Sequence, residues 1–125
     1  EHTEPHGNVL FIDDEKNQLR SYRRYFERYH QVYLAENADE ALNALSVRQD
    51  FNAVVMDVLL PETEGLRLLR LVGANARVKD RLILLVPPGL TAGVRDQLRK
   101  SGHILLNKPV DMESLESVLA HITRA

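Results

Sequence analysis

The chain has 125 residues, with 16 basic and 18 acidic side chains and a formal charge of −2. This length fits one compact domain, and 44% hydrophobic with 27% charged residues is typical of a folded globular protein rather than a disordered one. The near-neutral charge gives no general attraction to nucleic acid or anionic lipid. The absence of cysteine excludes disulfides, thiolate metal sites and thiol catalysis.

The apolar runs of the sequence are far shorter than a membrane span, and the opening EHTEPHGN lacks the apolar core of a signal peptide. We therefore expect a soluble, cytoplasmic domain with no membrane partner. Residues 1–7 are expected to be a flexible N-terminal arm or a remnant of cloning, and residues 8–125 to form the domain.

Short apolar runs alternate with amphipathic segments in the first half of the chain. NVLFI (residues 8–12) predicts a strand, as do residues 32–35 and 53–57. The helix after the first strand has the predicted inward residues Leu19, Tyr22, Phe26 and Tyr29. Asn37, with Glu40 three residues on, predicts the capped start of a second helix. The inward residues of that helix are predicted to be Ala41, Leu42 and Leu45.

The second half of the chain continues the same alternation. Thr63 is predicted to cap a third helix with inward residues Leu66, Leu69 and Val72. LILLV (residues 82–86) predicts a fourth strand, whose continuous apolar character fits burial on both faces. Thr91 is predicted to cap a fourth helix, with Val94 and Leu98 inward, and Gly102 to end it.

A fifth strand is predicted at HILLN (residues 103–107), and Asp111 is predicted to open the last helix. Its inward residues are predicted to be Met112, Leu115, Val118, Leu119 and Ile122. Five successive strand and helix units favour an α/β fold, with a parallel sheet covered by helices on both faces.

Polar side chains follow three of the predicted strands. Asp13 and Asp14 end the first strand, Asp57 ends the third, and Lys108 follows the fifth. Ligands of open α/β sheets bind at the carboxyl ends of the strands, so these side chains are expected to converge. Carboxylates brought together repel, so either their pKa values rise or a cation lies among them, and the cation is favoured because oxygen ligands without His or Cys suit Mg²⁺, or Mn²⁺ as an alternative.

A carboxylate beside a divalent cation and a lysine suits attack of an Asp on phosphorus, with Lys108 placed to bind a phosphoryl oxygen. Each residue also has a simpler interpretation. Asp13 and Asp14 could cap the first helix, Asp57 could belong to a turn before Pro61, and Lys108 could be a solvated lysine. Their joint occurrence at three strand ends favours the site.

The chain resembles the receiver domain of two-component response regulators. The resemblance is carried by VLFIDDE, AENADEAL, VVMDVLLPETEGLRLL and NKP, in this order, and it extends from about residue 8 to residue 122. It implies a flavodoxin-like (βα)5 fold, a doubly wound parallel five-stranded sheet with strand order 2-1-3-4-5. It also implies a signalling domain rather than an enzyme, which takes a phosphoryl group onto Asp57 from a histidine kinase or phosphotransfer protein.

The resemblance further implies a set of site residues. Asp14, Asp57 and the backbone carbonyl of Leu59 would ligate Mg²⁺, and Asp13 would hold it chiefly through water. Lys108 would bind the phosphoryl group, and the bond from Lys108 to Pro109 would be cis. An output domain or protein partner would be reached through the fourth helix, fifth strand and fifth helix, with a homodimer left open.

Two positions depart from the family pattern. Where the family usually has Ser or Thr at the end of the fourth strand, this chain has Val86, followed by Pro87, which lacks an N–H. Two hydrogen-bond donors to the phosphoryl group are therefore missing. Leu105 occupies the position of the Tyr or Phe that many receivers use as a switch. Val86 and Leu105 also suit simple packing on apolar strands.

Two functions are consistent with these residues. The first is a phosphoaccepting receiver that signals by an atypical route, and the second is an interaction module that works without phosphorylation. A dehalogenase-like phosphatase is disfavoured because Leu59 stands where a second Asp is needed, and a flavodoxin because DDEKNQ is acidic. Direct DNA binding is also disfavoured, since the arginines of RSYRRYFER fall on the solvent face of a helix.

Overall fold

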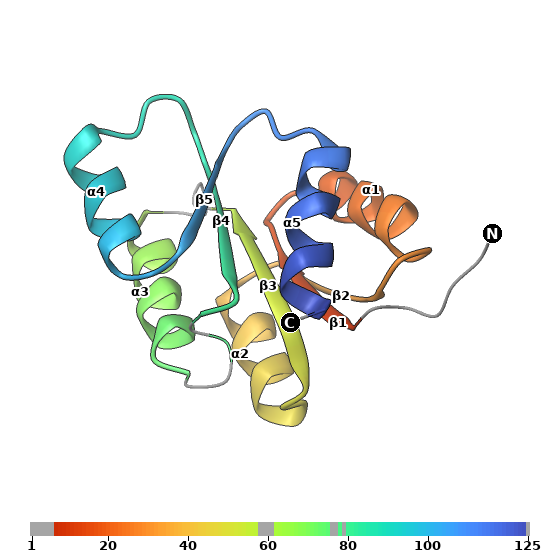
Figure 1. Ribbon diagram of the computed structural model, residues 1–125. Helices are drawn as coiled ribbons and strands as arrows, with labels where there is room; N and C mark the ends of the chain where they lie inside the picture. Colours follow the sequence, from red (N-terminus) through yellow and green to blue (C-terminus); the bar gives the residue numbers. More distant parts are fainter. Residues whose placement is uncertain (1–6, 58–61, 76–77, 79, 125) are drawn as a thin grey trace.

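A computed structural model of the chain describes residues 7–57, 62–75, 78 and 80–124. Five strands and five helices alternate along these residues (Figure 1). The strands are β1 (Asn8–Ile12), β2 (Gln31–Ala35), β3 (Phe51–Asp57), β4 (Leu82–Val86) and β5 (Ile104–Asn107). The helices are α1 (Lys16–Phe26), α2 (Ala38–Val47), α3 (Glu62–Gly73), α4 (Ala92–Lys100) and α5 (Met112–Arg124).

The five strands form one parallel sheet in the order β2-β1-β3-β4-β5. This is the flavodoxin-like arrangement that the resemblance implied, so the prediction of the fold is confirmed. The strand order changes direction between β1 and β3, and a ligand crevice is expected at that point, at the carboxyl ends of the strands. The pairing of Ile12 with Met56 brings the next residues, Asp13 and Asp57, side by side there.

The two faces of the sheet carry separate apolar clusters. Helices α2, α3 and α4 cover one face, where Leu45, Leu68, Val72 and Leu98 pack on strand residues that include Met56, Leu84 and Val86 (Figure 1). Helices α1 and α5 cover the other face. There, Phe11 stacks on Tyr22 at 4.7 Å and on Phe26 at 5.2 Å between ring centroids. Both faces being covered explains why the central strands are apolar throughout.

Four predicted helix signals are confirmed. Asn37 caps α2 by accepting from the Glu40 N–H at 2.8 Å, and Thr91 caps α4 by accepting from the Val94 N–H at 3.3 Å. Asp111 accepts from the Ser114 N–H at 3.2 Å at the start of α5. Gly102 follows α4 with a φ of 88°, the left-handed conformation that favours glycine after a helix.

Two predictions about the helices are wrong. Thr63 does not precede α3, because the helix already begins at Glu62. On the same helix the inward positions of Leu69 and Val72 are confirmed, since Leu69 packs half-buried against the core and Val72 is buried beside the fully buried Leu68, while the side chain of Leu66 lies outside the described residues. Val94, predicted to face inward, is 38% exposed, and Leu98 is the one buried residue of this fully described helix.

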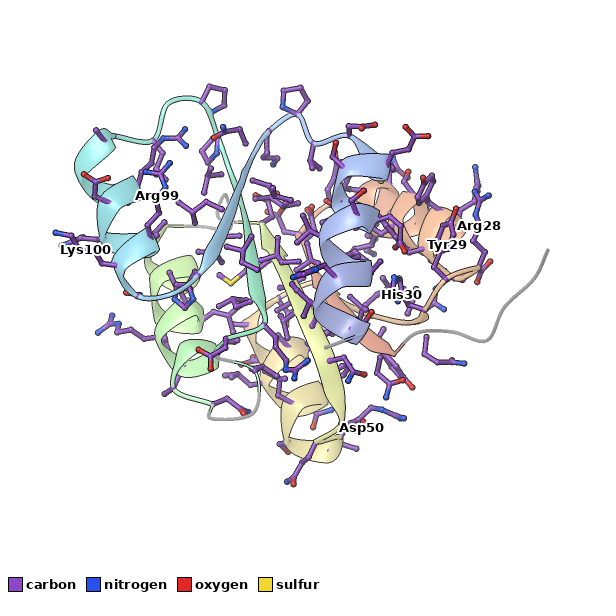
Figure 2. The ribbon with its side chains drawn as sticks, in the orientation of Figure 1. Arg28, Tyr29, His30, Asp50, Arg99 and Lys100 are labelled. Atoms are coloured by element: carbon purple, nitrogen blue, oxygen red, sulfur yellow. The ribbon has the colours of Figure 1, made fainter. Side chains whose placement is uncertain are left out.

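Tyr29 departs from its prediction in another way. It lies after the last residue of α1, in the turn that leads to β2, and is half-buried there. The next residue, His30, is 1% exposed, and its Nε2 lies 2.7 Å from Glu116 Oε1 on α5. Figure 2 shows Tyr29 and His30 at this end of α1, beside α5. The contact links α5 to the turn between α1 and β2.

None of the helices within the described residues is long and apolar enough to cross a bilayer. The Lys108–Pro109 peptide bond is cis, in agreement with the resemblance.

Candidate functional site

The carboxyl ends of β1, β3 and β5 border an open cleft of about 660 Å³. Asp13, Asp14, Asp57 and Lys108, the four residues that the sequence singled out, all line it. They belong to loops and strand ends far apart in the sequence, and the parallel pairing of the strands brings them to one edge. The prediction that these side chains converge is therefore confirmed.

Asp57 is the last residue of β3 and is 5% exposed. Its Oδ2 accepts a hydrogen bond of 2.9 Å from Lys108 Nζ. A charged pair of this kind is a strong, directional contact. Without the Lys108 ammonium, the buried Asp57 carboxylate would lack this compensating positive charge. The backbone N–H of Lys108 donates to the Val86 carbonyl at 2.9 Å, so the lysine is anchored to β4 as well.

Asp13 is 3% exposed and extends β1, since its N–H donates to the Ala35 carbonyl at 3.1 Å. Burial raises the pKa of Asp13 from 3.8 to about 6, and the negative charges of Asp57 and Asp14 act in the same direction. The Glu15 N–H, which donates to Asp13 Oδ1 at 2.9 Å, and the charge of Lys108 oppose this rise. The ionised form of Asp13 is therefore disfavoured by its burial and by the neighbouring acids.

The described residues that line the cleft include four carboxyl groups, from Asp13, Asp14, Glu15 and Asp57, and one ammonium group, from Lys108. Within the part of the chain that the structure describes, no three of these acids are arranged as a ready metal-ligand group. Asp57 faces Lys108, Asp13 faces the Glu15 N–H, and Asp14 is exposed. Leu59, expected to offer its carbonyl, lies outside the described residues.

This donor set nevertheless fits a hydrated divalent cation. Mg²⁺ binds through one or two carboxylates and keeps several waters, so it does not need a cage of three protein side chains. An excess of carboxyl groups and the raised pKa of Asp13 indicate a cleft that a cation would stabilise.

The end of β4 differs from the other three strand ends. Val86 is 0% exposed and packs in the cluster beneath α2, α3 and α4, and Leu105 packs half-buried against the same cluster. Neither Val86 nor Pro87 is among the described residues that line the cleft. The Pro87 carbonyl accepts from the Leu90 N–H at 3.3 Å and from Arg95 Nη2 at 3.0 Å. Val86 has no hydroxyl and Pro87 has no N–H to offer an anion.

Several lining residues were not predicted from the sequence. Gln18 and Tyr22 reach the cleft from α1, and Val110 and Met112 from the segment after Lys108. Burial raises the pKa of Tyr22 to about 12, so its hydroxyl stays protonated, and Gln18 hydrogen-bonds to it. Gln18 follows Asp14 by four residues, and this spacing could have predicted that Gln18 lines the same cleft. Tyr22 was assigned to the core alone, although its hydroxyl end reaches the cleft.

The family model of the response regulator receiver domain matches residues 9–120 of the chain. The chain belongs to this family of signalling domains. A curated relative, the two-component response regulator ORR24 of Oryza sativa subsp. indica, is 32% identical over 119 residues. The match covers 93% of this chain and 18% of that protein, so the chain spans less than a fifth of this relative's length.

Solved structures agree on the fold. A response regulator receiver domain protein from Clostridium thermocellum superposes with a TM-score of 0.81 at 21% identity, covering 94% of each chain. The signal receiver domain of a signal transduction histidine kinase from Syntrophus aciditrophicus gives a TM-score of 0.76 at 25% identity, covering 95% of this chain and 94% of the other. The topology is therefore that of known receiver domains.

Proposed function

We propose that the chain is a receiver that accepts a phosphoryl group on Asp57 from a histidine kinase or phosphotransfer protein, with Mg²⁺. The observation that carries the proposal is the buried Asp57 carboxylate at the end of β3, held 2.9 Å from the Lys108 ammonium in an acidic cleft. Family membership supports the same assignment. The cytoplasmic location expected from the sequence is part of this proposal.

The proposed reaction is a displacement at phosphorus. A carboxylate oxygen of Asp57 forms a bond to the phosphorus of a phosphohistidine while the phosphorus–nitrogen bond breaks, and the bonding pair leaves with the imidazole. Lys108 can turn from Asp57 to an oxygen of a phosphoryl group on that carboxylate, because the Lys108 and Asp57 side chains line the same cleft. The positive charge of Lys108 then stabilises the negative charge on the phosphoryl oxygens in the transition state.

The proposed cation site uses Asp13, Asp14, Asp57 and the Leu59 carbonyl. A bound Mg²⁺ would supply positive charge to the phosphoryl oxygens. Asp57 is fixed by the sheet and Asp13 by the Glu15 N–H, so these two carboxylates are held in place before binding. Asp14 is exposed and free of such fixing within the described contacts, which suits a ligand that adjusts on binding.

Incubation with acetyl phosphate and Mg²⁺, followed by intact-mass measurement, tests the proposal. The wild type should gain the mass of one phosphoryl group, and Asp57→Asn should gain none. Asp50→Asn is a matched control, because Asp50 is an exposed acid just before β3, at the opposite end of that strand (Figure 2). The proposal would be refuted if no small phosphodonor phosphorylated the wild type or the control. It would also be refuted if Asp57→Asn were phosphorylated as much as the wild type.

A second candidate is an interaction module that works without phosphorylation. The packing of Val86 and Leu105 in the core and the missing N–H of Pro87 favour it, because these residues remove the usual means of sensing a phosphoryl group. The expected binding surface is formed by α4, β5 and α5, for an output domain, a protein partner or a second copy. Partner binding or dimerisation that is identical with and without beryllofluoride, a phosphoryl mimic, would support this candidate.

A further inference from the structure

Arg95 occupies an unusual position on α4. Most of this helix is exposed and Leu98 alone is buried, although all its residues are described. Arg95, one turn before Leu98, is half-buried and directs its guanidinium back toward the β4–α4 loop. The neighbouring Arg99 instead reaches Asp96 on its own helix at 3.4 Å, with its side chain 60% exposed.

The guanidinium of Arg95 makes three hydrogen bonds. Nε donates to the Leu90 carbonyl at 3.3 Å, and Nη2 donates to the Pro87 carbonyl at 3.0 Å. Nη1 donates to Asn107 Oδ1 at 2.6 Å, the shortest of the three. The first two acceptors belong to the β4–α4 loop and the third is the last residue of β5, so one planar group joins three segments.

These contacts lead to the phosphoryl site. Asn107 precedes Lys108, whose N–H donates to the Val86 carbonyl and whose Nζ donates to Asp57. A continuous series of hydrogen bonds and one peptide link therefore runs from α4 through Arg95, Asn107 and Lys108 to Asp57. The usual connection, by a hydroxyl at Val86 and an aromatic ring at Leu105, is absent from this sequence.

We propose that Arg95 is a positioning residue that couples the state of Asp57 to the place of α4, acting through Asn107 on Lys108. The inference rests on the proposed phosphorylation of Asp57 and names the residue that transmits it. When Lys108 moves from the Asp57 carboxylate to a phosphoryl oxygen, the Arg95–Asn107 bond carries the accompanying shift at the end of β5 to the β4–α4 loop. Leu98 is the one buried residue of α4 and most of this helix is exposed, so the helix can respond.

The first experiment needs no phosphoryl group. Amide NMR spectra and hydrogen exchange of wild type, Arg95→Met and Arg99→Met are compared in the metal-free state. Arg95→Met should shift the Lys108 amide and speed exchange of residues 92–100 by about tenfold, while Arg99→Met, a matched change on the same helix, should do neither. An unchanged Lys108 amide in Arg95→Met would overturn the inference even if Asp57 is never phosphorylated.

The second experiment separates transmission from structure. Beryllofluoride with Mg²⁺ is added to each variant, and the responses of the Lys108 amide and of the α4 amides are recorded. Arg95→Met should keep the response at Lys108 and lose at least about two-thirds of the response in α4, with Asn107→Leu giving the same loss and the double variant no more. Arg95→Lys, which keeps the charge but not the three contacts, should restore the response only in part.

The two failures are distinguishable. A wild type that gives no response to beryllofluoride at Lys108 contradicts the proposed function, and the inference about transmission fails with it. A wild type that responds at Lys108 and in α4, with Arg95→Met and Asn107→Leu responding equally in α4, leaves the proposed function standing and refutes the role of Arg95.

Discussion

The two sides of the cleft differ in the chemistry they retain. The ends of β1, β3 and β5 supply Asp13, Asp57 and Lys108, which are held by specific hydrogen bonds and strand pairing. The end of β4 supplies Val86, which has no hydroxyl, and Pro87, which has no N–H, and neither is among the described residues that line the cleft. Under the proposed function, the residues for attack on phosphorus are therefore retained while those that would sense the product are not.

This difference indicates that accepting a phosphoryl group and transmitting its presence are separable tasks. The first depends on charge in a partly buried cleft, where interactions are strong. The second depends on a movable contact between the cleft and an exposed helix. In this chain the β4–α4 loop is tied through its carbonyls to Arg95, rather than through its own donors to the cleft.

The largest expected effect concerns Lys108, on the side of the cleft formed by the ends of β1, β3 and β5, which we call the retained side. Lys108→Met should lower the rate of phosphorylation by acetyl phosphate about 10²–10³-fold, because it removes the charge that opposes the developing negative charge on the phosphoryl oxygens. Lys100→Met is the matched control, since Lys100 projects from the outer side of α4 (Figure 2). A Lys108→Met rate within about threefold of wild type, by mass spectrometric time course, would mean that the two sides do not differ as described.

The next effect comes from restoring hydrogen-bond donors at the end of β4, which we call the altered side. Val86→Thr returns a hydroxyl and Pro87→Ala returns an N–H, and each is expected to raise the phosphorylation rate or the phosphoryl half-life about tenfold. Burying the hydroxyl should cost roughly 1–2 kcal/mol of unfolding free energy, which urea titration checks. Val55→Thr makes the same change on β3, on the face covered by α1 and α5. If the double variant Val86→Thr/Pro87→Ala kept the wild-type phosphorylation rate and phosphoryl half-life, the missing donors would not be what limits phosphorylation of Asp57.

A smaller effect concerns the charge of Asp13 without metal. Its pKa is raised on folding from 3.8 to about 6, so its contribution to stability is complete below pH 3.8 and is lost as the pH rises through about 6. At pH 7.5 with chelator, Asp13→Asn should therefore stabilise the domain by roughly 1–2 kcal/mol, since water in the open cleft screens part of the effect.

Urea unfolding at pH 4 and pH 7.5 checks this effect of Asp13. The gain should largely vanish at pH 4, where Asp13 is protonated in the folded chain, and Asp14→Asn should change stability less at either pH because Asp14 is exposed. An equal gain from Asp13→Asn at both pH values would show that shape rather than charge is responsible.

Much of this architecture could be predicted from the sequence because it depends on local patterns. Apolar runs that are buried on both faces identified the strands, and Asn37, Thr91, Gly102 and Asp111 identified helix ends through contacts within four residues. Asp13, Asp57 and Lys108 could be placed together because parallel strands end at the same edge of a sheet.

The remaining features depend on how elements are placed in space. Periodicity predicted an inward Val94, but it could not show that this side chain stays exposed where α4 begins. The bond from Arg95 to Asn107 depends on the path of the β4–α4 loop, which no local pattern specifies. The assignment of metal ligands stays a prediction, because it depends on a cation and on Leu59.

The smallest expected effect tests how loosely α4 is held on the altered side. Val94→Thr should change the unfolding free energy by less than about 0.5 kcal/mol, because this side chain is 38% exposed and has little burial to lose. Leu98→Ala, four residues on and 8% exposed, should cost about 2–4 kcal/mol, since it empties the contact that attaches α4 to the cluster beneath it. Comparable losses from both variants in urea would mean that α4 packs along its whole length, and a helix fixed in that way could not respond through Arg95.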